Sequence, residues 1–159
     1  MGPVMTTIRL ATPADAKAIA ALSWREVEQH WPWHWNPPSA LSAMLDRDAN
    51  VALALGADGQ LVGFGVMEYH DDTAHLSLLV VNATARRRGI GTMLLRWLER
   101  VAAVAAIARI EVEERRSDTA ALAFYASRGY VRSGVSGYYV RLCKALAQGG
   151  GAAARERSP

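Results

Sequence analysis

The hydrophobic pattern changes its period within the stretch from His75 to Leu98. Residues 75–81 (HLSLLVV) form a short run dominated by Leu and Val, without Gly or Pro, which predicts a strand buried on both faces. From Gly89 onward, apolar residues recur at helical spacing and charged residues fall on the other side, which predicts an amphipathic helix. The apolar positions of that helix are Leu94, Leu95, Leu98, Val101 and Ala102. The stretch therefore predicts a strand, a polar turn and a helix in succession.

The rest of the chain shows strand and helix patterns separated by turn residues. The first half predicts a strand over 7–10 and then a helix capped by Thr12, whose inner side carries Ile19, Leu22, Ser23 and Val27. A short helix is predicted from Ser39, with Leu41, Met44 and Leu45 on one face. A hairpin of strands over 51–55 and 60–69 follows. The second half predicts a strand over 108–114 with Ile110 and Val112 on one side. A helix is predicted over 117–128, capped by Ser117 or Asp118 and ended by Gly129. Two strands within 130–142, broken by Gly134 and Gly137, complete the pattern. The order β-α-α-β-β-β-α-β-α-β-β indicates the α/β (α+β) class, a mixed sheet flanked by helices.

Length, charge and cysteine content exclude several classes of protein. At 159 residues the chain fits a single domain over 1–147, followed by a tail at 148–159 whose Gly and Ala runs predict disorder. The net charge of +3 is too small for a general nucleic-acid binder. The uncharged apolar run at 101–108 is too short to span a membrane, and residues 1–10 lack the apolar region of a secretory signal. The single cysteine, Cys143, excludes an internal disulfide, and we expect a cytoplasmic protein without nucleic-acid or membrane partners.

The polar turn between the strand and the amphipathic helix is basic and rich in glycine. It reads Arg86-Arg87-Arg88-Gly89-Ile90-Gly91, or R-x-x-G-x-G. A nucleotide P-loop requires a Gly-Lys pair, which the chain lacks, and a dinucleotide fingerprint requires a third glycine, which is missing here. Glycines let a backbone approach a ligand closely, and the free N–H groups and the dipole of a helix N-terminus favour an anion. The turn therefore suits a phosphate group, although a solvated turn has the same composition.

Two motifs in this order resemble the GNAT (GCN5-related N-acetyltransferase) superfamily. R-x-x-G-x-G resembles its acyl-CoA pyrophosphate loop, and residues 118–130 (DTAALAFYASRGY) are similar to its pattern N-x-x-A-x-x-F/L-Y-x-x-x-G-F/Y. Residues 110–129 and Gly137-Tyr138-Tyr139 also resemble the ribosomal-protein alanine acetyltransferase subgroup. The chain departs from the pattern in having Ala83 where Pro is frequent, Asp118 in place of Asn, and a short segment after Tyr139. The resemblance implies a GNAT-type sheet, mixed and mostly antiparallel.

The same resemblance implies that acetyl-CoA is bound as a co-substrate. The pantetheine is expected along the end of the strand, where a backbone N–H, that of Val81 by position, can hold the thioester oxygen. The backbone N–H groups of the loop and its arginine charge are expected to hold the pyrophosphate. The cofactor-binding residues implied in this way are Leu79, Val80, Val81, Arg86, Arg87, Arg88, Gly89, Ile90, Gly91, Thr92, Asp118 and Tyr125.

Two residues are implied to move protons during acetyl transfer. Tyr125 matches the tyrosine that protonates the departing thiolate, and its alternative role is that of a packed aromatic side chain. Glu113 falls on the base of the resembling subgroup when the sequences are matched without gaps on Tyr125. The alternative for Glu113 is a solvated carboxylate that pairs with Arg115. Glu111, on the same strand face, and Glu68 remain further candidates for the base.

The tryptophan-rich segment before the second predicted helix lies where this family places its acceptor loop. We predict that Trp31, Trp33, His34 and Trp35 contact the acceptor, because aromatic faces attract an ammonium group. The alternative is a loop that packs its own tryptophans. The histidines of this segment have no Cys or carboxylate beside them, so no metal site is predicted.

These features predict an acetyl-CoA-dependent N-acetyltransferase. The acceptor is a primary amine, either a protein N-terminus or lysine or a small molecule, which attacks directly in a ternary complex without a covalent intermediate. The alternative is a non-catalytic acyl-CoA sensor, which would keep the basic loop but would need neither Tyr125 nor a base. A monomer or a homodimer is compatible with the sequence.

Overall fold

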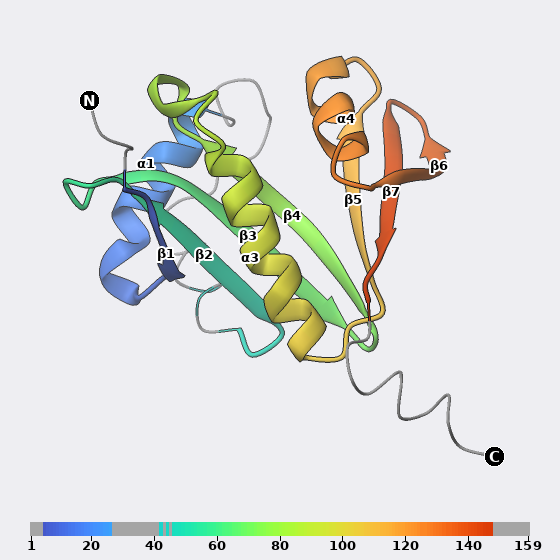
Figure 1. Ribbon diagram of the computed structural model, residues 1–159, viewed down its shortest axis with the longest axis horizontal. Helices are drawn as coiled ribbons and strands as arrows, with labels where there is room; N and C mark the ends of the chain where they lie inside the picture. The colour runs from blue at the N-terminus through green and yellow to red at the C-terminus, as the bar shows by residue number, and fades with distance from the viewer. Residues whose placement is uncertain (1–4, 27–41, 43, 45, 148–159) are drawn as a thin grey trace. The chain divides into compact units, whose positions relative to one another are not determined.

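The computed structural model describes residues 5–26, 42, 44 and 46–147 (Figure 1). The predictions made for Val27, Ser39, Leu41 and Leu45 and for the tail lie outside this part. The chain forms two compact units, and each is described below by itself. The first unit comprises Met1–Glu68 and Leu78–Leu98, and the second comprises Tyr69–Ser77 and Glu99–Pro159.

The described elements follow the predicted order. The strands are β1 (Thr7–Leu10), β2 (Ala49–Leu55), β3 (Leu61–His70), β4 (Thr73–Val81), β5 (Arg109–Arg115), β6 (Val131–Ser136) and β7 (Tyr139–Ala145). The helices are the short 3-10 turns η1 (Pro13–Asp15) and η3 (Ala83–Ala85) and the α-helices α1 (Ala16–Glu26), α3 (Ile90–Val104) and α4 (Thr119–Ala126). None of the described helices is long and apolar enough to cross a membrane.

The strands form the mixed, mostly antiparallel sheet that was expected. Their order is β1-β2-β3-β4-β5-β7-β6. The β4–β5 pair is parallel, whereas β1–β2, β2–β3, β5–β7 and β6–β7 are antiparallel. The predicted fold class, a mixed sheet with helices, is therefore confirmed.

The first unit has its core between α1 and the β2–β3 hairpin. The buried residues are Ala16, Ile19 and Leu22 of α1, Val51 and Leu53 of β2, Phe64 and Val66 of β3, and Val80 of β4. The Asp15 carboxylate secures the start of the helical segment, because it accepts the backbone N–H of Thr12 at 2.7 Å and pairs with Arg9 at 2.9 Å. These contacts, the Arg9 hydrogen bond foremost, lower the pKa of Asp15 to about 2. The predicted inner side of the helix, Ile19, Leu22 and Ser23, is confirmed.

Helix α3 packs on the face of β3 that points away from α1. Alternate residues of a strand point to opposite faces, so Gly63 and Gly65 lie on the side away from Phe64 and Val66. A Cβ atom on Gly63 would come within 2.8 Å of the Val80 carbonyl oxygen and 3.2 Å of Leu94. These glycines therefore let α3 lie close to the sheet, which positions the helix N-terminus that follows β4.

The second unit is built on β5 and β7. The start of β4 pairs with β5 from Thr73↔Arg109 to His75↔Glu111, and β5 pairs with β7 along its whole length. Ile110 and Val112 are buried while Arg109 and Glu113 are exposed, as the alternation predicted. Helix α4 begins after the Asp118 cap, whose Oδ1 accepts the N–H of Ala121 at 3.0 Å.

Three local predictions need correction. The β4 strand is not buried on both faces, because Ser77 is exposed between the buried Leu76 and Val80, and a run of Leu and Val does not specify burial by itself. The Thr12 cap is confirmed, but the first turn that follows it is the 3-10 turn η1 and not an α-helical turn. Gly134 does not break the last strands but lies inside β6, where the register shifts next to Arg132 as a bulge permits.

Candidate functional site

The exit of the chain from β4 is held by Asn82. Its side-chain oxygen accepts the N–H of Thr84 at 3.2 Å and so caps η3, while its own N–H donates to Val62 on β3 at 2.8 Å. Ala85 is buried at the end of this turn. These contacts fix the point from which the basic loop 86–91 starts.

The backbone of this basic loop has free donors. The N–H groups of residues 87–91 donate to no acceptor in the described part of the chain, and α3 begins at Ile90. Arg87 and Gly89 have φ angles of 65° and 76°, in the left-handed region. Apart from the two chain neighbours, no atom of the described residues lies within 4 Å of the position that a Cβ on Gly89 would take, so the backbone is open on that side. An anion can therefore approach several N–H groups at the positive end of a helix, which fits a pyrophosphate group.

The three arginines of the loop are not equivalent. Arg86 donates to the Glu26 carboxylate at 2.9 Å, whose other oxygen accepts the N–H of Ala83 at 3.0 Å. Arg87 and Arg88 are exposed and have no ion pair with another described residue. Arg87 and Arg88 therefore remain available to a phosphate, whereas Arg86 ties η3 and the loop to α1.

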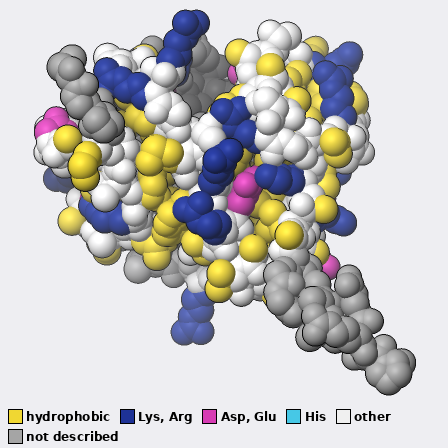
Figure 2. All heavy atoms as spheres, in the orientation of Figure 1, with side chains coloured by type: hydrophobic (Ala, Val, Ile, Leu, Met, Phe, Trp, Pro, Cys, Tyr) yellow, Lys and Arg dark blue, Asp and Glu magenta, His cyan; other side chains and the backbone are white. Residues whose placement is uncertain are grey.

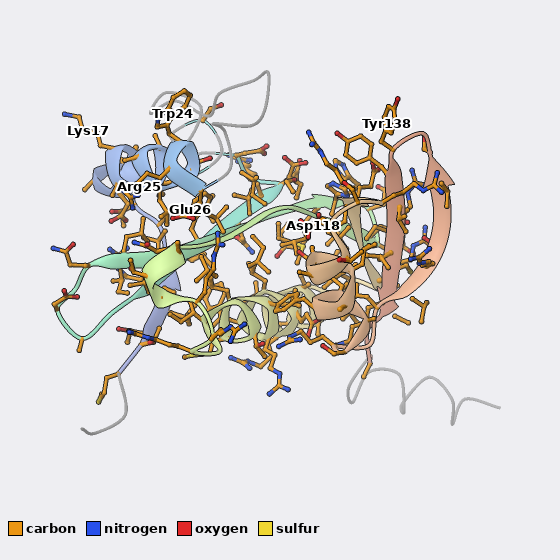
Figure 3. The ribbon with its side chains drawn as sticks, turned by 90° about the horizontal axis from the view of Figure 1, so that it is seen from above. Lys17, Trp24, Arg25, Glu26, Asp118 and Tyr138 are labelled. Carbon is orange, nitrogen blue, oxygen red and sulfur yellow. The ribbon has the colours of Figure 1, made fainter. Side chains whose placement is uncertain are left out.

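Glu26 is a residue of the loop architecture that was not predicted from the sequence. It ends α1, and Figure 3 shows it on the inner side of that helix while Lys17 and Trp24 project outward. Its ion pair joins residues 60 positions apart, and no local pattern marks such a pair. Its side chain is only 11% exposed, so the carboxylate is mostly shielded from solvent.

The end of β4 presents Leu79, Val80 and Val81 in the same unit. Val80 is part of the core, and Leu79 and Val81 are half-buried. The predicted pantetheine contact along these residues, and the role of the Val81 N–H, stay predictions.

Tyr125 lies in a buried aromatic group of the second unit. It is 4% exposed, and its ring makes edge contacts with Phe124 (centroids 5.1 Å apart) and Tyr130 (5.4 Å). Its hydroxyl has no hydrogen-bond partner among the described residues. Burial, and next the charges of Glu114 and Asp118, raise the pKa of its phenol above the ordinary value. The Tyr125 ring is therefore packed against other aromatic side chains, as its alternative role predicted. Its protonated hydroxyl makes no hydrogen bond with a described residue.

Tyr130, the other buried tyrosine, differs because its hydroxyl is engaged. It donates to Glu99 at 2.8 Å, and Lys144 donates to both oxygens of the same carboxylate at 3.2 Å. Burial raises the pKa of Tyr130 too, and the Glu99 charge adds to this effect. This network links α3, the residue that precedes β6, and β7 within the second unit, and it has a structural role.

The predicted base, Glu113, lies on the exposed face of β5. Its carboxylate pairs across the strands with Arg141 at 3.6 Å, and Glu111 on the same face pairs with Arg109 at 3.2 Å. The alternative prediction for Glu113 was an ion pair with Arg115. The structure shows an ion pair, but its cation is Arg141. Whether Glu113 acts as the base stays a prediction.

Glu114 is an acidic residue of the second unit that was not predicted as part of the site. It lies on the opposite face of β5 from Glu113, together with Ile110 and Val112. Burial, with a contribution from the Asp118 charge, raises its pKa to about 7. The sequence holds a signal for this position: alternate residues of a strand point to opposite faces, so of the adjacent Glu113 and Glu114 one must share the face of Ile110 and Val112.

The remaining predicted residues fall into two groups. Trp31, Trp33, His34 and Trp35 lie outside the described residues. Asp118 is the N-cap of α4, as predicted, and its contact with a cofactor stays a prediction. Basic side chains are more frequent than acidic ones on the face seen in Figure 2, in keeping with the positive net charge.

Known proteins match the chain over most of its length. Residues 17–130 match the model of the acetyltransferase (GNAT) family. The chain is 28% identical over 126 residues to the [ribosomal protein bS18]-alanine N-acetyltransferase of Salmonella typhimurium, covering 79% of this chain and 81% of that protein.

Solved structures share the fold. The PaiA N-acetyltransferase from Thermoplasma acidophilum, in complex with coenzyme A, is similar with a TM-score of 0.82 at 17% identity, covering 89% of this chain and 99% of that one. The ribosomal-protein-S18-alanine N-acetyltransferase from Escherichia coli gives a TM-score of 0.78 at 20% identity, covering 92% and 97%.

Proposed function

The chain belongs to the acetyltransferase (GNAT) family, and from this premise we propose that it transfers the acetyl group of acetyl-CoA to a primary amine in a ternary complex. The observation that carries the proposal is the basic loop. Within the described part of the chain, its N–H groups at residues 87–91 have no acceptor, Gly89 is open on one side, and Arg87 and Arg88 have no ion pair. These features suit the pyrophosphate of coenzyme A.

The proposed reaction assigns proton transfers to two side chains. Acetyl-CoA supplies the acetyl group and a thiol leaving group. Glu113 accepts the proton of the attacking amine, directly or through a water molecule, and Tyr125 donates its hydroxyl proton to the sulfur as the carbon–sulfur bond breaks. The role of Tyr125 is supported by its matched position in the family motif and by its hydroxyl, which has no hydrogen-bond partner among the described residues. The assignment of Glu113 is supported by its matched position.

The acceptor class is also a proposal. The Salmonella relative is named for an alanine of a ribosomal protein, which favours a peptide with a free N-terminal alanine as the first acceptor to test. Lysine side chains and small-molecule amines are the other members of the class. A cytoplasmic location and a monomeric or homodimeric state remain part of the proposal.

A non-catalytic acyl-CoA sensor is the alternative. Release of free thiol from acetyl-CoA, measured with and without a panel of amines, separates the two functions. An enzyme gives thiol release that depends on the amine. Tight binding of coenzyme A without amine-dependent release would favour the sensor and contradict the proposal.

A further inference from the structure

The Glu26 carboxylate, at the end of α1 in the first unit, holds two points of the chain between β4 and the basic loop (Figure 3). One carboxylate oxygen accepts the backbone N–H of Ala83 at 3.0 Å, and the other accepts a hydrogen bond from the Arg86 guanidinium at 2.9 Å. Arg86 also donates from Nε to the carbonyl oxygen of Val81 at 3.4 Å. Glu26 is therefore bonded to the first residue of η3 and to the residue that follows its last one.

The turn η3 alone restrains the start of the basic loop only weakly. Asn82 secures its beginning, but the backbone bond that closes it, from the Arg86 N–H to the Ala83 carbonyl oxygen, is 3.4 Å long and lies beyond the usual range of an N–H···O bond. The two bonds to Glu26 are shorter, and a partly buried ion pair is screened less by solvent and salt than an exposed one. The position from which residues 87–91 start therefore depends on a side chain of α1.

The N–H group that Glu26 accepts exists because position 83 is alanine, where the family pattern frequently has proline. The backbone would accept a proline there. Asn82 has a ψ of 134°, within the range that a residue before proline prefers, and Ala83 is the first residue of η3, where proline is tolerated. A proline ring would restrain the turn by itself. With Ala83 the backbone is freer, and its bond to Glu26 restrains it instead.

We propose that Glu26 is a positioning residue of the coenzyme A site, which holds the N–H groups of residues 87–91 in the arrangement that binds the pyrophosphate. This inference rests on the proposed function, in which the basic loop binds that group. In this arrangement Arg86 is a link between α1 and the loop and not a phosphate ligand, because Glu26 occupies its guanidinium.

The first test compares Glu26→Ala with Glu26→Gln by titration calorimetry with coenzyme A. Both variants remove the same negative charge near an anionic ligand, so the ratio of their Kd values cancels that effect. Glutamine keeps one acceptor oxygen at this position, whereas alanine keeps none. We expect Glu26→Ala to bind roughly three- to thirtyfold more weakly than Glu26→Gln, because the N–H groups of the loop are displaced but not blocked. Equal Kd values of the two folded variants would overturn the inference.

Asp15→Ala is the matched control for a general loss of stability in the first unit. Asp15, near the start of the helical segment, accepts one backbone N–H, that of Thr12 at 2.7 Å, and pairs with one arginine, Arg9 at 2.9 Å, as Glu26 does at the other end. Urea unfolding should show a loss of stability in Asp15→Ala and in Glu26→Ala, whereas coenzyme A affinity should fall only in Glu26→Ala. An equal loss of affinity in Asp15→Ala would contradict a specific role of Glu26.

Ala83→Pro tests whether Glu26 acts by restraining η3. The substitution removes the N–H that Glu26 accepts and fixes the φ angle at position 83. In the Ala83→Pro background, the Kd ratio between Glu26→Ala and Glu26→Gln should fall toward one, because the ring restrains the turn without Glu26. An undiminished ratio contradicts the inference. Circular dichroism spectra show whether each variant is folded.

Steady-state kinetics separates this inference from the proposed function. The pyrophosphate is joined to the reacting thioester only through the long pantetheine arm, so its contacts should stabilise substrate and transition state equally. Glu26→Ala should therefore raise KM for acetyl-CoA relative to Glu26→Gln and leave kcat nearly unchanged. A lower kcat with an unchanged KM would overturn the inference even in an active acetyltransferase. Absence of acetyl transfer to every amine, with the difference in coenzyme A affinity retained, instead contradicts the proposed function.

Discussion

Gly89→Ala is the substitution whose outcome depends most directly on the basic loop. Gly89 has a φ of 76°, and a non-glycine residue in the left-handed region costs about 1–2 kcal/mol. The alanine also restricts the unfolded chain, which offsets about 0.4–1 kcal/mol. No described atom lies within 4 Å of the added Cβ. The free energy of unfolding should therefore fall by only about 1 kcal/mol, through the backbone alone.

The effect of Gly89→Ala on coenzyme A affinity should be larger than its effect on stability. In the proposed complex, the added methyl group would occupy the open side of Gly89, from which the pyrophosphate would reach the N–H groups of 87–91. Loss of one hydrogen bond to a charged group costs about 1.5–3 kcal/mol. That loss corresponds to roughly ten- to hundredfold weaker binding.

Gly59→Ala is the matched control. Gly59 has a φ of 80° in the β2–β3 turn, and its Cβ position is likewise free of atoms within 4 Å. Urea unfolding should show a similar loss of stability in both variants, whereas titration calorimetry with coenzyme A should show weaker binding only for Gly89→Ala. Unchanged affinity of a folded Gly89→Ala protein would refute the assignment of this loop to the pyrophosphate.

Three further predictions concern single side chains. Tyr125→Phe should lower kcat by roughly ten- to ten-thousandfold with little change in coenzyme A affinity, as measured by steady-state kinetics and calorimetry, because only the proton donor is lost. Glu26→Ala should lower the free energy of unfolding by about 1–3 kcal/mol, since the N–H of Ala83 loses its acceptor, whereas Glu26→Gln, which keeps an oxygen there, should lower it less. The pKa of Glu114 is raised from 4.5 to about 7 in the folded protein, so the folded state binds this proton more tightly than the unfolded state does. Ionisation of Glu114 therefore destabilises the fold as the pH rises from 4.5 to about 7. Glu114→Gln should therefore raise stability at pH 8, by at most about 3 kcal/mol, and should not raise it at pH 4, as compared by urea unfolding at the two pH values.

The elements that define the basic loop could be predicted because their signals are local. The apolar spacing of Leu94, Leu95 and Leu98 predicts α3, and the Gly89 position predicts where the backbone opens. The Asp118 cap and the Gly129 stop likewise act within a few residues of α4. Local patterns of this kind are visible without knowledge of the tertiary structure.

The contacts that complete the two units could not be predicted in this way. Glu26 holds Arg86 from 60 residues away, so the composition of the loop does not show that Arg86 differs from Arg87 and Arg88, which have no ion pair with a described residue. The role of Tyr130 depends on Glu99, 31 residues distant. The match to the family motif marks Glu113 and not Glu114, and the pleat of β5 turns these two side chains to opposite faces of the sheet.

In the proposed reaction, this chain moves an acetyl group from acetyl-CoA directly to an amine. Mass spectrometry of both components tests it, after incubation of the protein with acetyl-CoA in the presence and absence of a peptide with a free N-terminal alanine. We predict one acetyl group on the peptide nitrogen, none on the protein in the absence of peptide, and slower formation of the product with Tyr125→Phe. An acetylated protein that passes its group on to the peptide would contradict direct transfer, and an unmodified amine across the whole panel would contradict the enzyme itself.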